Sequence, residues 1–170
     1  MGIVGLGRIG KTLSNLLQPF NVNILDNDIS PDIAFRRIAG IEWVDKNTLF
    51  HQSDIVSLNV PLTQSTYHLV DKSALKQMKP TAILINTTRG KVIDKLALIQ
   101  ALQQKTIAGA AIDVFENEPY DGRLCQYENT VLTCHMGAST KESRYQMELE
   151  AVQEIIRFNC VEELLNEIVF

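Results

Sequence analysis

Three polar side chains, Arg89, Glu118 and His135, each follow a short apolar run and could together handle charge and protons. A guanidinium can clamp a carboxylate with two parallel hydrogen bonds. An imidazole can take up or return a proton because its pKa lies near neutrality, and a nearby carboxylate favours imidazolium. This set suits hydride transfer at a carbonyl or carbinol carbon, with a cofactor carrying the hydride. The alternative for Arg89 is a side chain that only caps the end of its strand.

Neighbouring residues offer competing interpretations of these segments. Glu116 lies in the same segment as Glu118 and is an alternative carboxylate. Cys134 precedes His135, but neighbours on an extended segment point in opposite directions and cannot form a nucleophile–base pair. A metal site built from Cys125, Cys134 and His135 lacks ligand spacing. We therefore expect neither a thiol nucleophile nor a metal ion.

The first ten residues predict the dinucleotide site that such chemistry needs. A short apolar run leads into Gly-x-Gly-x-x-Gly at Gly5, Gly7 and Gly10, and a helix is expected over 11–17. Gly5 would allow the tight turn, Gly7 the approach of a pyrophosphate, and Gly10 the close packing of helix on strand. The phosphates would lie at the helix N-terminus, where unpaired N–H groups and the helix dipole favour negative charge.

A carboxylate after the second apolar run supports this interpretation. Residues 21–26 are predicted to form a strand, and Asp26 ends it 21 residues after Gly5. An acid at that place accepts hydrogen bonds from the adenosine ribose hydroxyls. It also repels a 2′-phosphate, so NAD is expected rather than NADP. The alternative is an ordinary polar turn after a strand, since Asp28 also lies nearby.

The alternation of apolar runs with helical segments predicts an α/β fold, a Rossmann-type doubly wound parallel sheet with helices on both faces. Further strands are expected at 54–60, 81–86, 107–112 and 130–133, and helices at 73–78, 94–104 with Asp94 as N-cap, and 139 to about 166. In such folds ligands bind at the carboxyl ends of the strands. The polar segments after the strands would meet at that edge.

Composition narrows the class of protein. A net charge of −4 disfavours a nucleic-acid partner, which calls for a basic face. No apolar run approaches the roughly 20 residues that span a bilayer. Three cysteines, an odd number without framework spacing, fit reduced thiols in a cytoplasm. A hydrophobic content of 45% is sufficient for the core of one domain.

Five motifs in order resemble the NAD-binding domain of the D-isomer-specific 2-hydroxyacid dehydrogenases, the family of D-3-phosphoglycerate, glycerate and D-lactate dehydrogenases. They are GIVGLGRIG, LNVPLT, INTTRGKVID, GAAIDVFENEP and CHMGASTKES, and they span almost the whole chain. The resemblance implies NAD as cofactor, hydride transfer between NAD(H) and a D-2-hydroxy acid or 2-keto acid, and a homodimer formed through this domain.

The resemblance also implies roles for individual residues. His135 would be the proton donor and acceptor, Glu118 its pKa-raising partner, Arg89 the clamp on the substrate carboxylate, and Asp113 the ligand of the nicotinamide carboxamide. The remaining cofactor contacts would be Arg8 and Ile9 at the pyrophosphate, Asp26 at the ribose, Val60, Pro61 and Thr66 around the adenosine half, and Thr87, Thr88, Gly137 and Ala138 beside the nicotinamide, with Arg89 and His135 also bordering it.

Two departures from the family pattern qualify these expectations. The family usually has proline where this chain has Cys134, so the backbone before His135 is expected to be looser. The family also has a split substrate domain, and residues 1–170 are expected to be the dinucleotide-binding domain alone, whether excised, truncated or natural. We therefore expect NAD(H) binding with poor turnover by this chain alone. The alternative is a non-catalytic NAD-sensing interaction module or a degenerate remnant.

Overall fold

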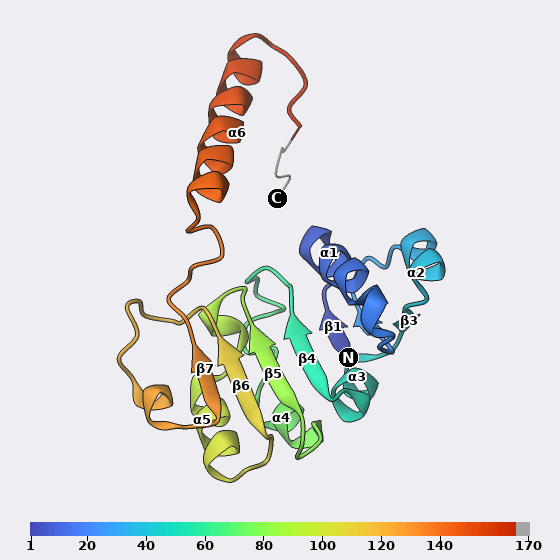
Figure 1. Cartoon of the computed structure of the whole chain (residues 1–170), viewed down its shortest axis with the longest axis vertical. Helices are drawn as coiled ribbons and strands as arrows, with labels where there is room; N and C mark the ends of the chain where they lie inside the picture. Colours follow the sequence, from blue (N-terminus) through green and yellow to red (C-terminus); the bar gives the residue numbers. More distant parts are fainter. Residues whose placement is uncertain (166–170) are drawn as a thin grey trace. The chain divides into compact units, whose positions relative to one another are not determined.

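The computed structural model describes residues 1–165 and divides the chain into two units, Met1–Cys134 and His135–Phe170. The first unit contains a seven-stranded parallel sheet with the order β3-β2-β1-β4-β5-β6-β7 (Figure 1). The strands are β1 Gly2–Val4, β2 Leu25–Asn27, β3 Glu42–Trp43, β4 Ile55–Leu58, β5 Ile83–Asn86, β6 Gly109–Ile112 and β7 Thr130–Leu132. The predicted Rossmann-type fold class is confirmed.

The helices of the first unit connect these strands. They are α1 Arg8–Leu17, α2 Ile33–Ala39, α3 Lys46–Gln52, α4 Lys72–Gln77 and α5 Lys95–Gln103, with short 3-10 turns η1 Gln18–Phe20, η2 Gly90–Val92 and η3 Arg123–Gln126. Asp94 accepts hydrogen bonds from the N–H groups of Leu96 and Ala97, which confirms it as the N-cap of α5. Sequence reasoning missed β3, α2 and α3.

The chain reverses direction across the sheet between β1 and β4. β1 pairs with β2 on one side and with β4 on the other, and all of these pairs are parallel. The chain therefore builds outward to β3 and then returns to the centre to build outward to β7. In open parallel sheets this reversal opens a crevice at the carboxyl ends of the two central strands, where ligands bind.

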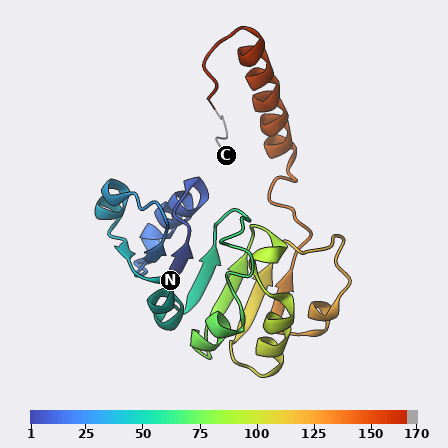
Figure 2. The same ribbon diagram turned by 180° about the vertical axis from the view of Figure 1, so that it is seen from behind.

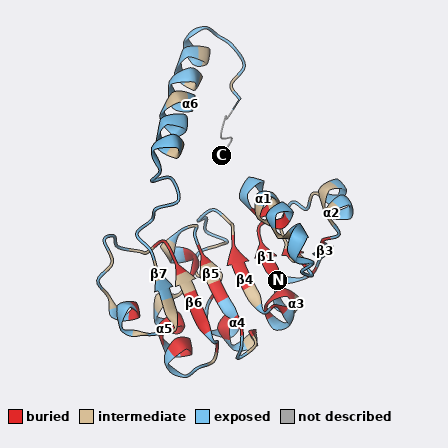
Figure 3. Cartoon of the chain, in the orientation of Figure 1, coloured by how far each residue is buried: buried red, intermediate tan, exposed pale blue. Residues whose placement is uncertain are grey.

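Alternate residues of the central strand face two separate cores. Ile3 packs in a cluster with Leu6, Ile24 and Ile41 that α1 and α2 cover. Val4 faces the larger cluster, which α3, α4 and α5 cover. The green and yellow-green helices of Figure 2 are those of the second face, and Figure 3 shows the buried residues concentrated along the strands. Helices thus lie on both faces of the sheet, as predicted.

The second unit contains helix α6, Lys141–Asn159. Thr140 caps it by accepting a hydrogen bond from the N–H of Ser143. The helix ends earlier than predicted, because Val161 takes a left-handed φ of 58°; the predicted end near Asn166 lies outside the described residues. No helix within 1–165 is long and apolar enough to cross a membrane. Cys125, Cys134 and Cys160 are free and exposed.

Candidate cofactor-binding and active site

The glycine-rich turn lies between β1 and α1, at the carboxyl end of the central strand. Gly5 has a φ of +93°, which side chains rarely adopt, and a Cβ there would come within 2.8 Å of the carbonyl oxygen of Asn59. Gly7 caps α1 without a side-chain hydrogen bond, and nothing lies within 4 Å of where its Cβ would be. Gly10 is buried in the first turns of α1. The turn therefore leaves backbone N–H groups of the helix N-terminus open to a ligand.

A cavity of about 600 Å³ opens on one side of this turn. The residues that line it include five that were predicted to contact the cofactor: Gly5, Gly7, Val60, Pro61 and Thr66. Thr66 donates a hydrogen bond of 2.6 Å from its Oγ1 to the carbonyl oxygen of Pro61, which fixes the segment after β4. The volume is in the range of sites for small molecules and cofactors.

A second cavity, of about 780 Å³, opens on the other side. Arg8, Ile9 and Thr87, which were predicted to contact the pyrophosphate and the nicotinamide, line it. Asn59, just after β4, lines both cavities. Both cavities therefore border the carboxyl end of β4, beside the point where the order of the strands reverses.

Asp26, the predicted ribose ligand, lies within β2 opposite Ile3 and is fully buried. Burial raises its pKa to about 6, the charge of Asp28 raises it as well, and Arg36 lowers it. The Nε of Arg36 is 3.8 Å from Oδ2 of Asp26. Among the described residues, neither carboxylate oxygen of Asp26 has a hydrogen-bond partner. Asp26 is not among the residues that line the 600 Å³ cavity.

Asp28 is the carboxylate that lines this cavity. Its Oδ2 accepts a hydrogen bond of 2.7 Å from the N–H of Leu6 in the glycine-rich turn. Its Oδ1 accepts one of 2.8 Å from the N–H of Ser30. β2 continues to Asn27, one residue beyond the predicted end, and the carboxylate that reaches the cavity, that of the half-buried Asp28, therefore comes later than expected. Sequence reasoning had considered Asp28 only as part of an ordinary turn.

The segment after β5 carries Arg89 on a turn that Asn86 closes. The Nδ2 of Asn86, a fully buried residue, donates to the carbonyl oxygen of Arg89 at 3.0 Å. Its Oδ1 accepts from the N–H and the hydroxyl of Thr88 at 3.0 and 2.8 Å. Arg89 itself is exposed and donates from Nη1 to the carbonyl oxygen of Thr88. Asn86 was not predicted as a site residue, although it is the last residue of the strand.

Asp113 lies at the next strand end, directly after β6, and is nearly buried. The hydroxyl of Thr133 donates to its Oδ1, and its own N–H donates to the carbonyl oxygen of Asn86 at 3.0 Å. The polar residues after β5, β6 and β7 are therefore linked side by side. Thr133 was likewise missed by sequence reasoning, because its role depends on the pairing of β6 with β7.

The loop after β6 carries the two competing carboxylates in different environments. Oε1 of Glu118 accepts a hydrogen bond of 2.8 Å from the N–H of Phe115. Glu116 instead forms an ion pair with Lys95, the first residue of α5, with 3.2 Å between Nζ and Oε2. Glu116 therefore already has a structural partner.

His135, Gly137 and Ala138 belong to the second unit. His135 has a left-handed φ of 55°, and the N–H of Ser139 donates to the carbonyl oxygen of Met136 at 3.0 Å. The approach of His135 to Arg89 and Glu118 stays a prediction. Residues 1–165 contain no group of three His, Cys, Asp or Glu side chains that could hold a metal ion.

Comparison with known enzymes gives consistent matches. Glyoxylate reductase of Thermococcus litoralis is 45% identical over 159 residues, which are 93% of this chain and 48% of that protein. Glyoxylate/hydroxypyruvate reductase B of Enterobacter agglomerans is 41% identical over 159 residues, 92% of this chain and 49% of that protein. The chain thus spans about half the length of the curated relatives that it matches.

Solved structures of dehydrogenases also match the fold of this chain. The holo form of D-mandelate dehydrogenase from Rhodotorula graminis matches with a TM-score of 0.91 and 34% identity, over 99% of this chain and 51% of that one. The NAD-complexed D-isomer specific 2-hydroxyacid dehydrogenase of Lactobacillus delbrueckii ssp. bulgaricus matches with a TM-score of 0.87 and 27% identity, over 98% and 55% of the two chains.

A family model decides the assignment. The model described as D-isomer specific 2-hydroxyacid dehydrogenase, NAD binding domain, matches residues 1–137. These residues include the glycine-rich turn, both cavities and the ends of β5, β6 and β7. The chain therefore belongs to the D-isomer specific 2-hydroxyacid dehydrogenases, of which it carries the NAD binding domain.

Proposed function

We propose that this chain is the cofactor-binding part of an oxidoreductase that reduces a 2-keto acid to a D-2-hydroxy acid with NADH, and catalyses the reverse reaction with NAD. The observation that carries the proposal is the pair of cavities that both border Asn59 and the glycine-rich turn or the first residues of α1. The names of the curated relatives support glyoxylate or hydroxypyruvate, both small 2-keto acids, as substrates to test first.

The dinucleotide would extend across both cavities. Its adenosine half would lie in the 600 Å³ cavity against Val60, Pro61 and Thr66. Its pyrophosphate would lie at the N-terminus of α1, which has no acidic residue in its first turn and begins with Arg8. Unpaired N–H groups, the helix dipole and a guanidinium all favour an anion there. The nicotinamide half would then point toward Thr87 and the ends of β5 and β6.

Asp28, rather than Asp26, would accept the hydrogen bonds of the adenosine ribose. Asp26 is fully buried within β2, whereas the carboxylate of Asp28 lines the cavity and is oriented by the N–H of Leu6. A carboxylate at this place repels a 2′-phosphate, which supports NAD over NADP.

Bound NADH would supply the hydride, and the chain would supply orientation and the proton. Arg89 would clamp the carboxylate of the keto acid, on a turn fixed by the buried Asn86. An imidazole nitrogen of His135 would give its proton to the carbonyl oxygen as the hydride reaches the carbon. Glu118 would favour the imidazolium form before transfer. Asp113, oriented by the hydroxyl of Thr133, would hold the nicotinamide carboxamide.

Residues 1–170 would be the dinucleotide-binding domain, and the substrate domain would correspond to the other half of the relatives' length. Closure of two domains excludes water and fixes the substrate, so turnover by this chain alone should be poor. A homodimer is also proposed, because Ile155, Ile156 and Phe158 of α6 expose 61%, 55% and 72% of their surface. Three free, exposed cysteines fit a reducing, cytoplasmic environment.

The test is a fluorescence titration of the chain with NADH and NADPH, followed by an assay with glyoxylate. We expect saturable binding of NADH, weaker binding of NADPH, and slow NADH oxidation that increases when the substrate domain is joined to the chain. Absence of NADH binding would refute the proposal. Binding with no activity even in the two-domain protein would favour an NAD-sensing module instead. Gel filtration tests the homodimer.

A further inference from the structure

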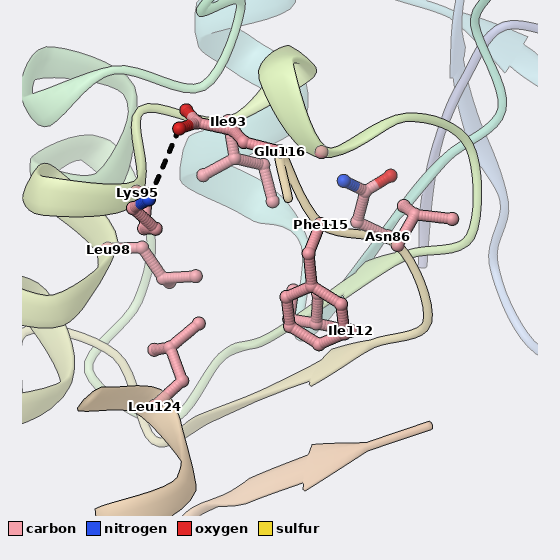
Figure 4. Close-up of a pocket in the computed structure, with 10 residues that line it drawn as sticks. Asn86, Ile93, Lys95, Leu98, Ile112, Phe115, Glu116 and Leu124 are labelled. Atoms are coloured by element: carbon pink, nitrogen blue, oxygen red, sulfur yellow. Dashed lines mark hydrogen bonds and ion pairs between the residues drawn. The ribbon is translucent and has the colours of Figure 1, made fainter. Parts of the chain in front are cut away.

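The loop that carries Glu118 meets the turn that carries Arg89 around a small internal cavity (Figure 4). The cavity measures about 20 Å³, enough for a single water molecule but not for a ligand. Figure 4 shows Phe115 and Glu116 on one side of it, Asn86 near the strand end, and Lys95 reaching Glu116 from α5. This cavity is therefore too small to bind a ligand, and its lining brings residues of the two site loops together.

The ion pair between Lys95 and Glu116 joins these elements across 21 residues of sequence. Nζ and Oε2 are 3.2 Å apart, and the two side chains are only 32% and 26% exposed. Lys95 is the first residue of α5, where the helix dipole disfavours a cation. A lysine at this position does not stabilise the helix itself. Its ion pair with the partly buried carboxylate of Glu116 explains its presence instead.

The backbone at Glu116 also touches the Arg89 turn directly. A Cβ on Gly90 would overlap the backbone of Phe115 and Glu116. The two loops are therefore in van der Waals contact along their main chains. The backbone of Glu116 therefore cannot move toward Gly90, the residue that follows Arg89, without a clash.

Phe115 connects Glu116 to the part of the loop that carries Glu118. Its N–H donates a hydrogen bond of 2.8 Å to Oε1 of Glu118, and its ring stacks on Tyr120 with centroids 4.2 Å apart. Two residues before it, Asp113 leaves β6. The anchor at Glu116 is thus adjacent to the hydrogen bond that orients Glu118, and close to Asp113.

From these contacts, and resting on the proposed function, we propose that Lys95 and Glu116 are positioning residues. Their ion pair holds the 113–119 loop against α5 and the Arg89–Gly90 turn. It thereby sets the places of Asp113 and Glu118 beside the nicotinamide half of the cofactor. Neither residue contacts the reacting atoms, and their effect is exerted through the loop.

The chain offers a matched control in a second lysine ion pair. Nζ of Lys79 lies 2.7 Å from Oδ1 of Asp54, and the lysine side chain is 38% exposed. Asp54 precedes β4, so this pair lies at the amino ends of the strands, and neither residue lines either of the two large cavities. Lys79→Met removes a comparable charge without touching the 113–119 loop.

The first experiment measures hydrogen exchange of the Phe115 amide by NMR, which needs neither cofactor nor activity. We expect exchange about threefold faster in Lys95→Met and Glu116→Gln, in line with the loss of a partly shielded ion pair. Lys95→Arg and Lys79→Met should exchange like the wild-type chain. Unchanged exchange in Lys95→Met, or an equal increase in Lys79→Met, would overturn the proposal.

The second experiment compares binding of NADH with binding of ADP-ribose, which lacks the nicotinamide. Lys95→Met should weaken NADH about threefold and leave ADP-ribose unchanged. The double charge reversal Lys95→Glu with Glu116→Lys should recover part of the NADH affinity that each single reversal loses. Equal effects on both ligands, or none, would refute the positioning role. A wild-type chain that binds neither ligand would instead refute the proposed function.

Discussion

Replacement of Asp26 by asparagine should stabilise the protein at neutral and alkaline pH. Asp26 is fully buried, and burial raises its pKa from 3.8 to about 6. A carboxyl whose pKa is higher in the folded state binds its proton more tightly there than in the unfolded chain. Its contribution to stability is therefore greatest below pH 3.8 and is lost as the pH rises through about 6.

The size of the effect follows from the shift. The change in pKa from 3.8 to about 6 corresponds to about 3 kcal/mol of unfavourable free energy in the ionised form. Asp26→Asn should remove this cost, so the variant should gain up to about 3 kcal/mol above pH 7 and almost nothing near pH 4. For a chain of this size, that gain corresponds to a rise in Tm of roughly 6–12 °C.

The assay is urea unfolding of wild type and Asp26→Asn between pH 4 and pH 8. The single tryptophan, Trp43, is a suitable probe because it pairs with Asp26 in the sheet. Asp54→Asn is the control, since Lys79 lowers the pKa of Asp54 by a hydrogen bond and the variant should lose stability only above the acid range. Curves of free energy against pH that run parallel for wild type and Asp26→Asn would refute this account of the buried carboxylate.

Three further variants test the site. Asp28→Ala should weaken NADH binding about tenfold and reduce the preference over NADPH, because charged hydrogen bonds to the ribose are lost; equal NADH affinity in titrations of both proteins would contradict this. Gly5→Ala should lower the free energy of unfolding by about 1–3 kcal/mol, because alanine would be strained at the φ of +93° that Gly5 adopts. A variant that unfolds at the same urea concentration as the wild-type chain would show that this position carries no such strain. Asn86→Ala should lower it by about 2–3 kcal/mol, because the turn before Arg89 loses hydrogen bonds to a buried amide, and activity of the two-domain protein should fall with it; a variant as stable and active as wild type would show that Asn86 does not hold Arg89.

The fold could be predicted where a strand is buried on both sides and a helix has a clear first residue. The run Ile55–Leu58 is largely apolar because the strand is buried along most of its length, and Asp94 marks the start of α5 by capping it. Of the missed elements, α3 does have such signals, because Asp45 caps it and Leu49 and Phe50 are buried, and it was overlooked. β3 has only two residues, both exposed, and α2 buries none of its residues, so neither leaves a hydrophobic pattern in the sequence.

The candidate site was predictable as a set of segments but not as a network. The motifs identified the turns after β1, β5 and β6, because residues at strand ends are polar and the strands themselves are not. The choice between Asp26 and Asp28 depends on where β2 stops, because Asp26 is buried inside the strand whereas Asp28 lies just beyond its last residue, Asn27. Partners such as Thr133 for Asp113 and Lys95 for Glu116 depend on tertiary contacts that no local pattern encodes.

The most direct test of the central claim is an NMR titration that maps which backbone amides of the chain respond to NADH. The account predicts saturable shifts at Gly7, at Val60 and at Thr87, residues that line the two cavities on either side of the glycine-rich turn. Amides of α4 and of the amino ends of β5, β6 and β7 should not move. Shifts confined to those regions, or no shifts at saturating NADH, would contradict the account.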